Sequence, residues 1–211
     1  MKLYYVPMAC SLATHIVLEW VGAAYDTVKL DIADTKSPEF LALNPNGAVP
    51  LLVDGDFVLS QNGAILYYVA ERYPNARLLG DGSSRSRAEV MRWLSFLNSD
   101  LHPAFKPIFK PTRFHPDNAL ARVIADTART HVREYLVRID AHLQGREWVV
   151  EQRSIADPYL FVMLRWAGKL SIDLSGLENL AHFFSRMSSD PSVRAAIIQE
   201  EGSAGVEASA A

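Results

Sequence analysis

The sequence predicts a small α/β domain followed by an all-helical domain, and three observations support this fold class. Strand, helix and strand patterns follow one another over residues 2–32, which is the order of a βαβ unit. The pair Asp54-Gly55 separates two apolar runs, which is a strong signal for a β-hairpin. After residue 84 the strand patterns nearly vanish and helical periodicity takes over. We therefore expect one domain over residues 1–79, a helical domain over 85–201 and a flexible polar tail over 202–211.

The first three elements alternate between strand and helix. Residues 2–6 are rich in aromatic and β-branched side chains and predict a strand that Pro7 ends. Apolar residues recur at helical spacing over residues 11–21, and Gly22 ends that helix. Apolar and polar residues alternate over 28–32, which predicts a second strand parallel to the first.

The rest of the first domain is a short helix, a hairpin and a longer helix. Ser37 is a favourable N-cap and Pro38 suits a first helical position, so we expect a helix over 37–43. The hairpin then adds two antiparallel strands, and a helix over 61–73 follows and ends before Pro74. These elements predict a four-stranded mixed sheet with helices packed on it.

The second domain is expected to contain helices alone. A helix over 85–111 should be kinked or broken in its second half by prolines 103, 107 and 111. Ser154 and Asp157 have the spacing of a helix N-terminus, and two shorter helices should cover about 177–187 and 192–200. Asp117 can cap a long helix whose expected inward-facing residues are Leu120, Val123, Ile124, Val132, Leu136, Ile139 and Leu143.

Composition excludes several classes of protein. The 211 residues carry a formal net charge of −3 without a clustered basic stretch, so no nucleic-acid partner is expected. No run of apolar residues is long enough for a membrane span, and the N-terminus lacks the apolar core of a signal peptide. The single cysteine favours a reducing compartment and a cytoplasmic location. The histidines lack metal-ligand spacing, so we expect no metal site.

Five stretches resemble one family in their order and spacing. They read MKLYYVPMACSLATHI, NPNGAVPLL, LSQNGAILYYVAE, DLHPAF and SIADPYLFVMLRWA. Together they are similar to the cytosolic glutathione S-transferases, and in particular to the bacterial beta class. The resemblance implies a thioredoxin-like first domain, a homodimer, and glutathione as cosubstrate with no further cofactor. It also implies transfer of glutathione to small, mostly hydrophobic electrophiles.

Cys10 raises the central question about chemistry. It lies between a strand and the start of a helix, where N–H donors and the helix dipole favour a negative charge. Taken alone, a free cysteine is more often a buried hydrophobic residue than a reactive thiol. The resemblance implies that Cys10 and Ser11 donate to the glutathione sulfur, that His102 shares its proton, and that Tyr5 is a further catalytic candidate. It also implies that Cys10 can form a mixed disulfide, which would allow thiol transfer or peroxide reduction.

Further residues are expected to bind glutathione. The resemblance implies a cis bond between Val49 and Pro50, which would let Val49 pair with an extended peptide. Gln61 and Asn62 begin a helix, where free N–H groups can hold a carboxylate, although Ser60 or Asn62 could simply cap the helix. Lys36 could pair with the glycyl carboxylate, or it could be an ordinary surface lysine.

One helix face of the second domain carries another group of candidates. Ser95, Ser99 and His102 follow helical spacing and predict one polar stripe, which could line a wet cleft or face solvent. The resemblance implies a cleft that binds glutathione, yet Pro103 stands where the family commonly has a lysine. Candidates for the hydrophobic substrate pocket, each also explicable as a core or surface residue, are Phe109, Arg165 and Trp166. The alternative function is a non-catalytic protein that carries hydrophobic ligands or tethers a partner.

Overall fold

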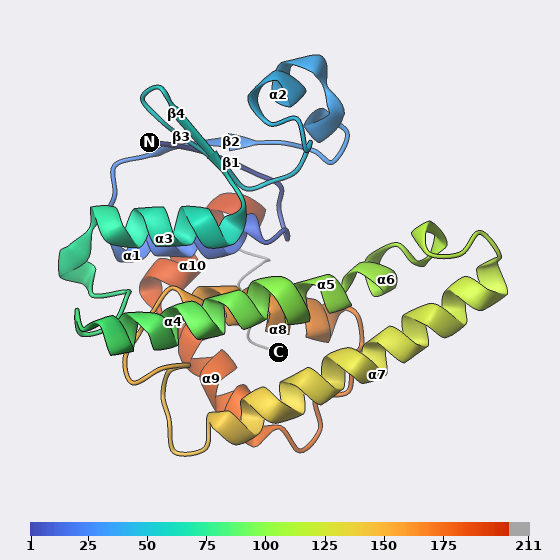
Figure 1. The fold of residues 1–211 in the computed structure, drawn as a ribbon. Helices are drawn as coiled ribbons and strands as arrows, with labels where there is room; N and C mark the ends of the chain where they lie inside the picture. The colour runs from blue at the N-terminus through green and yellow to red at the C-terminus, as the bar shows by residue number, and fades with distance from the viewer. Residues whose placement is uncertain (203–211) are drawn as a thin grey trace.

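The computed structural model describes residues 1–202 and has the two predicted parts (Figure 1). The tail expected over 202–211 lies outside the described residues from 203 onward. A four-stranded sheet has the order β2-β1-β3-β4, in which β1 and β2 are parallel and the other pairs are antiparallel. The strands are β1 (Lys2–Tyr5), β2 (Asp26–Lys29), β3 (Leu51–Asp54) and β4 (Phe57–Ser60). The mixed sheet and its hairpin are therefore confirmed.

Two helices cover the side of the sheet that faces the second domain. These are α1 (Ser11–Trp20) and α3 (Asn62–Arg72), whereas α2 (Pro38–Leu43) lies apart from them, above the sheet in the view of Figure 1. The Ser37 hydroxyl accepts a hydrogen bond from Phe40 N at 3.2 Å, which confirms the predicted N-cap of α2.

The second strand differs from its prediction. It ends at Lys29, and only the backbone N–H of Leu30 still bonds to the sheet, at 2.8 Å from Tyr5 O. Ile32 is 78% exposed. The chain turns away here because Asp34 accepts a hydrogen bond from the Asp31 N–H, which opens a 3-10 turn (η1, Asp34–Lys36). The predicted second strand, parallel to the first, is therefore confirmed, but it covers residues 26–29 rather than 28–32.

Beyond residue 84 the described chain contains only helices and turns, as predicted. Helix α8 is buried along most of its length and packs against α1, so it joins the two parts of the molecule. Within residues 1–202 no helix combines the length and apolar character needed to cross a bilayer. The main helices are α4 (Ser84–Phe96), α7 (Asn118–His142), α8 (Ala156–Lys169), α9 (Glu178–Ser189) and α10 (Pro191–Glu201).

The predicted helix over 85–111 is broken into short pieces. The prolines at 103, 107 and 111 each lie in the first turn of a piece, where a missing N–H removes no helical hydrogen bond. The break is therefore confirmed. After α4 the pieces are a π-helical turn (η3, Leu97–Leu101), α5 (His102–Ala104), α6 (Lys106–Phe109) and η4 (Pro111–Arg113).

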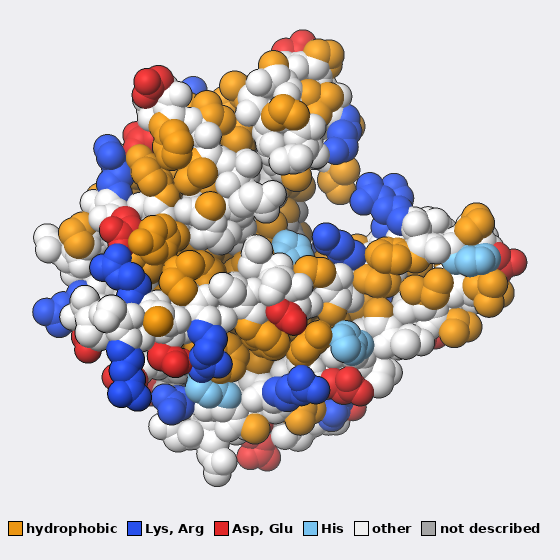
Figure 2. All heavy atoms as spheres, in the orientation of Figure 1, with side chains coloured by type: hydrophobic (Ala, Val, Ile, Leu, Met, Phe, Trp, Pro, Cys, Tyr) orange, Lys and Arg blue, Asp and Glu red, His pale blue; other side chains and the backbone are white. Residues whose placement is uncertain are grey.

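Helix α7 confirms its predicted cap but only part of its predicted face. The Asp117 carboxylate accepts from Ala119 N at 2.8 Å and from Leu120 N at 3.0 Å. Leu120 and Val123 are 50% and 60% exposed, so their expected inward positions are wrong. The N-terminal end of α7 projects beyond α8, and hydrophobic side chains gather on it (Figures 1 and 2). The inward face begins instead with the small residues Ala121, Ala125 and Ala128, and it continues with the predicted Val132, Leu136 and Ile139.

The start of α8 is organised by the predicted pair of Ser154 and Asp157. The buried Asp157 carboxylate accepts from Ser154 N at 2.7 Å and from Val149 N at 2.8 Å. The Ser154 hydroxyl accepts in turn from Ala156 N at 3.3 Å. Burial raises the pKa of Asp157 to about 6. This reciprocal arrangement confirms the predicted helix N-terminus.

Candidate active site

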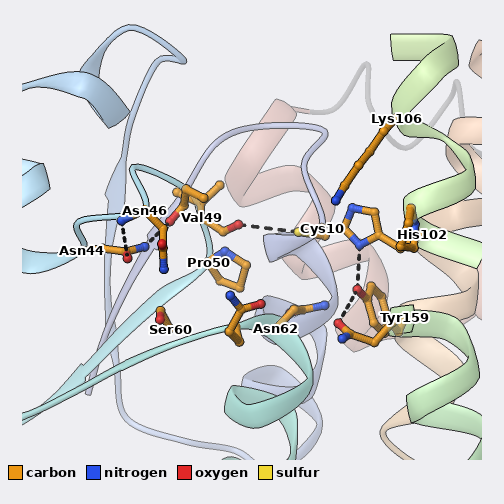
Figure 3. Close-up of a pocket in the computed structure, with 14 residues that line it drawn as sticks. Cys10, Asn44, Asn46, Val49, Pro50, Ser60, Asn62, His102, Lys106 and Tyr159 are labelled. Atoms are coloured by element: carbon orange, nitrogen blue, oxygen red, sulfur yellow. Dashed lines mark hydrogen bonds between the residues drawn. The ribbon is translucent and has the colours of Figure 1, made fainter. Parts of the chain in front are cut away.

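A cavity of about 300 Å³ lies between the sheet domain and the helical domain (Figure 3). In Figure 2 it appears as a hollow with basic side chains along its rim. Its volume is at the lower end of the range for small-molecule sites. The lining residues of the first domain are Cys10, Asn44, Asn46, Ala48, Val49, Pro50, Ser60, Gln61 and Asn62, and those of the second are Asn98, His102, Pro103, Lys106 and Tyr159.

Cys10 lies at the cavity, immediately before α1. It is only 9% exposed, and its thiol donates to Val49 O at 3.6 Å. Burial raises the pKa of the Cys10 thiol to about 12. The side chain is therefore a buried, protonated thiol that still faces the cavity, and it can donate a hydrogen bond to a ligand.

The loop before β3 is held in place by two side chains. The buried Asn44 amide donates to Ala48 O at 2.7 Å, and its oxygen accepts from Asn46 N at 3.2 Å. The Lys36 ammonium donates to Gly47 O at 2.8 Å. Gly47 has a φ of +55°, and a Cβ there would lie 2.6 Å from that ammonium.

This loop presents Val49 and Pro50 to the cavity. The peptide bond between them is cis, as the resemblance implied. The backbone N–H of Val49 makes no hydrogen bond within residues 1–202. Lys36 is not among the residues that line the cavity, and its ammonium donates to the loop carbonyl of Gly47. Its expected pairing with the glycyl carboxylate stays a prediction.

Asn62 contributes an unsatisfied donor at the start of α3. It is 4% exposed, and its side-chain oxygen accepts from the Thr14 hydroxyl at 2.8 Å. Its amide nitrogen is buried without a hydrogen-bond partner within the described chain. The preceding residue, Gln61, has a φ of 74° and makes no side-chain cap. Since buried polar groups are normally paired, Asn62 is arranged to meet an acceptor supplied by a ligand.

His102 is part of a chain of hydrogen bonds across the second domain. The Tyr159 hydroxyl donates to the Asn98 side-chain oxygen at 3.1 Å, and its oxygen lies 2.7 Å from His102 Nδ1. Because the hydroxyl proton is used toward Asn98, we assign the ring proton to Nδ1. The other ring nitrogen lies on the side of Cys10 and Lys106 (Figure 3). Burial, and then the Lys106 ammonium, lower the pKa of His102 to about 4, so the ring is neutral.

The predicted polar stripe is not continuous. Ser95 and Ser99 are exposed and do not line the cavity, and the Ser99 hydroxyl donates to Ser95 O at 2.9 Å. The π-helical turn over Leu97–Leu101 changes the angular register, which brings Asn98 rather than Ser99 to the cavity beside His102. The predicted place of Ser95 and Ser99 beside His102 in the cleft is therefore wrong.

Two predicted catalytic hydroxyls also lie elsewhere. Tyr5 is buried, and its hydroxyl donates to Gln199 O at 3.4 Å in the contact between the sheet domain and α10. Ser11 is fully buried, and its hydroxyl donates to Val6 O at 3.3 Å. Neither residue lines the cavity, because both side chains point into the packing around α1.

The expected hydrophobic pocket residues separate into two groups. The Trp166 ring lies 4.9 Å from the His102 ring and 5.2 Å from the half-exposed Phe109 ring, so the two aromatics form a cluster beside His102, but neither is among the residues that line the cavity. The Trp166 indole N–H also donates to Met8 O at 2.8 Å and so holds the loop before Cys10. Arg165 forms a two-point ion pair with Glu201 instead and does not line the cavity.

Sequence reasoning missed several lining residues. Asn44, Asn98 and Tyr159 carry no local motif for binding, and tertiary packing brings them to the cavity. Lys106 had a detectable signal, because it follows His102 by four residues and therefore falls on the same helical face.

Two family descriptions match most of the chain. Residues 1–71 match the glutathione S-transferase N-terminal domain, and residues 101–191 match the glutathione S-transferase C-terminal domain. Both matches agree with the two parts of the fold.

Individual relatives agree with this result. The chain is 52% identical to glutathione S-transferase GST-4.5 of Xanthomonas campestris over 203 residues, which cover 96% of this chain and 99% of that protein. The bacterial beta class glutathione S-transferase of Sphingomonas chungbukensis superimposes with a TM-score of 0.85 at 40% identity, over 96% and 100% of the two chains. A sphingomonad glutathione S-transferase solved in complex with glutathione gives 0.83 at 37% identity, over 95% and 98%. The chain belongs to the glutathione S-transferase family and is an enzyme of that family.

Proposed function

We propose that the cavity binds glutathione and that the chain joins its sulfur to small hydrophobic electrophiles. The observation that carries this proposal is the buried, unpartnered amide nitrogen of Asn62 at the start of α3. This amide and the free N–H groups of the helix start are suited to a carboxylate. The complex of the sphingomonad relative with glutathione supports the choice of ligand.

The remaining groups match the rest of this tripeptide. With the γ-glutamyl carboxylate at Asn62, the unpaired backbone N–H of Val49 can pair with the cysteinyl backbone as an added strand would. That placement brings the glutathione sulfur toward Cys10 and His102, which face each other across the cavity (Figure 3). The half-exposed Phe109 ring, which packs against the buried Trp166 ring beside His102, offers an apolar surface to the electrophile.

The chemistry requires the thiolate of glutathione, whose thiol pKa is about 8.5 when free. In the reaction the thiol gives its proton to solvent, and the sulfur lone pair forms a bond to the electrophilic carbon. The leaving group departs with its bonding electrons. The protonated Cys10 thiol donates to the sulfur, and the neutral His102 ring accepts a hydrogen bond from the thiol. Because its pKa is about 4, the His102 ring can orient the thiol proton of glutathione, but it is a weak base for that proton, which therefore passes to solvent.

Thiol transfer through Cys10 has less support. A mixed disulfide needs the Cys10 thiolate as nucleophile, and burial keeps that thiol protonated at neutral pH. We therefore place conjugation first. The homodimer, the cytoplasmic location and the domain boundaries at 79 and 85 stay predictions.

Calorimetric titration with glutathione tests the proposal through Asn62→Asp. This variant keeps an oxygen for the Thr14 hydroxyl but replaces the free amide by a second oxygen and adds a negative charge. We expect the Kd for glutathione to rise about tenfold or more, because a hydrogen bond to a charged group is lost. Asn118→Asp, the same change at the exposed start of α7, is the control and should bind as the wild type does.

An Asn62→Asp variant with unchanged affinity would overturn the assignment of the carboxylate to α3. A wild-type chain that shows no binding at millimolar glutathione would contradict the proposal as a whole. It would favour the non-catalytic carrier or tether instead.

A further inference from the structure

We infer that Lys106 is the cation that stabilises the thiolate of glutathione in this cavity. The inference rests on the proposed function and adds a residue to it. Lys106 is the first residue of α6, and its side chain extends toward His102 and Cys10 (Figure 3). Among the described residues, 1–202, that line the cavity, it is the only one with a formal charge at neutral pH.

The other two groups that face the sulfur are neutral. Cys10 keeps its proton because burial raises its pKa to about 12, and burial also keeps the His102 ring unprotonated. Asn62 and the Val49 backbone provide dipoles but no charge. A negative sulfur in this partly buried space therefore needs a positive group, and Lys106 is the lining residue that can supply it.

The ammonium of Lys106 is available for this role. It makes no ion pair or hydrogen bond with any residue of the described range 1–202, so no protein carboxylate competes for it. Its field already acts at the site, because it contributes to the low pKa of His102. The same field that disfavours a positive imidazole favours a negative sulfur nearby.

Lys106 could have a different role, because glutathione carries a second anionic group near the cavity that an ammonium could bind. The glycyl carboxylate could also pair with an ammonium, and Lys36, expected for that role, is bound to the carbonyl of Gly47. The two explanations differ in one respect: a thiolate partner matters only when the sulfur can ionise. S-methylglutathione keeps both carboxylates and cannot form a thiolate, so it separates the two.

The test is a pH titration of the bound thiol, followed by the ultraviolet absorbance of the thiolate. In Lys106→Met the apparent pKa of glutathione in the complex should rise by about one pH unit relative to wild type. Lys106→Arg keeps the charge and should restore most of the difference. Lys110→Met removes an exposed cation that does not line the cavity and is the matched control.

Affinity for S-methylglutathione completes the experiment. We expect Lys106→Met to bind it within about twofold of wild type, since the cation acts on the sulfur. An unchanged thiol pKa in Lys106→Met would overturn the inference, as would a loss of S-methylglutathione affinity that accounts for the whole loss with glutathione. A wild-type chain that does not bind glutathione itself would overturn the proposed function, and the inference with it.

Discussion

Two histidines, one within α1 and one that faces Cys10 from the second domain, show how a binding site differs from a polar cluster in the core. His15, within α1, has both ring nitrogens paired: Nδ1 lies 3.0 Å from Glu200 Oε1 and Nε2 lies 3.1 Å from Gln199 Oε1. His102 has one nitrogen bound to Tyr159 and the other free toward the cavity. The first histidine ties α10 to α1, and the second leaves a position for a ligand.

The two histidines differ in which polar groups around each ring lack a hydrogen-bond partner and in whether those groups face a shared cavity. Around His15, Tyr5 and Tyr25 pack against the ring at 5.8 and 5.5 Å, and the side chain is fully buried. The second carboxylate oxygen of its partner Glu200 has no hydrogen-bond partner within the described residues, but Glu200 does not line the cavity. Around His102 the cavity adds the free amide of Asn62 and an unpaired ammonium. Burial of a histidine alone is therefore a poor indicator of function, whereas unpaired polar groups around a shared space are a better one.

The largest expected effect is on stability, from His15→Ala. The variant leaves the buried Glu200 without its partner and opens a cavity, so the free energy of unfolding should fall by about 3 kcal/mol. Urea denaturation measures this change. His131→Ala, at an exposed position of α7, is the control and should change it by less than about 1 kcal/mol. A loss for His15→Ala as small as that of the control would contradict its structural role.

His102→Gln should show the opposite pattern. Glutamine can still donate to the Tyr159 hydroxyl but cannot place an acceptor nitrogen where the free ring nitrogen lies. We expect kcat/KM for glutathione with chlorodinitrobenzene to fall about tenfold or more, while the unfolding free energy changes by less than about 1 kcal/mol. His182→Gln, on the exposed side of α9, should match wild type in both measurements. A variant that unfolds easily but reacts normally would make His102 a second structural histidine.

A further expected effect concerns the dependence of stability on pH through Glu200. Burial raises the pKa of Glu200 from 4.5 to about 7, so the folded state holds a proton that the unfolded state has released. The contribution of this group to stability is therefore present below about pH 4.5 and is lost as the pH rises to about 7. Glu200→Gln should flatten this part of the profile of unfolding free energy against pH. Parallel profiles for wild type and variant would show that Glu200 does not titrate in this window.

Much of the fold was predictable because its signals are local. Ser37, Asp117 and the pair Ser154 and Asp157 each cap a helix through bonds to residues a few positions away. The hairpin at Asp54-Gly55 is equally local. The exposed Leu120 was not predictable, because whether the apolar face of a helix is covered depends on the length of its neighbours.

The site was predictable where a backbone feature marks it. Cys10, Val49, Pro50, Gln61 and Asn62 lie at helix starts or at the cis bond, and all line the cavity. Side chains that reach the cavity through tertiary packing escaped prediction, as Asn44 and Tyr159 did. Ser95 and Ser99 were misplaced because a π-helical turn leaves no clear mark in hydrophobic periodicity.

The most direct measurement is a crystal structure of the chain with glutathione bound. The γ-glutamyl carboxylate should lie at the amide of Asn62, the cysteinyl backbone against Val49, and the sulfur between Cys10 and His102. His15 should keep its bonds to Glu200 and Gln199 unchanged. Glutathione bound outside this cavity, or bound with its sulfur directed away from Cys10 and His102, would contradict the account.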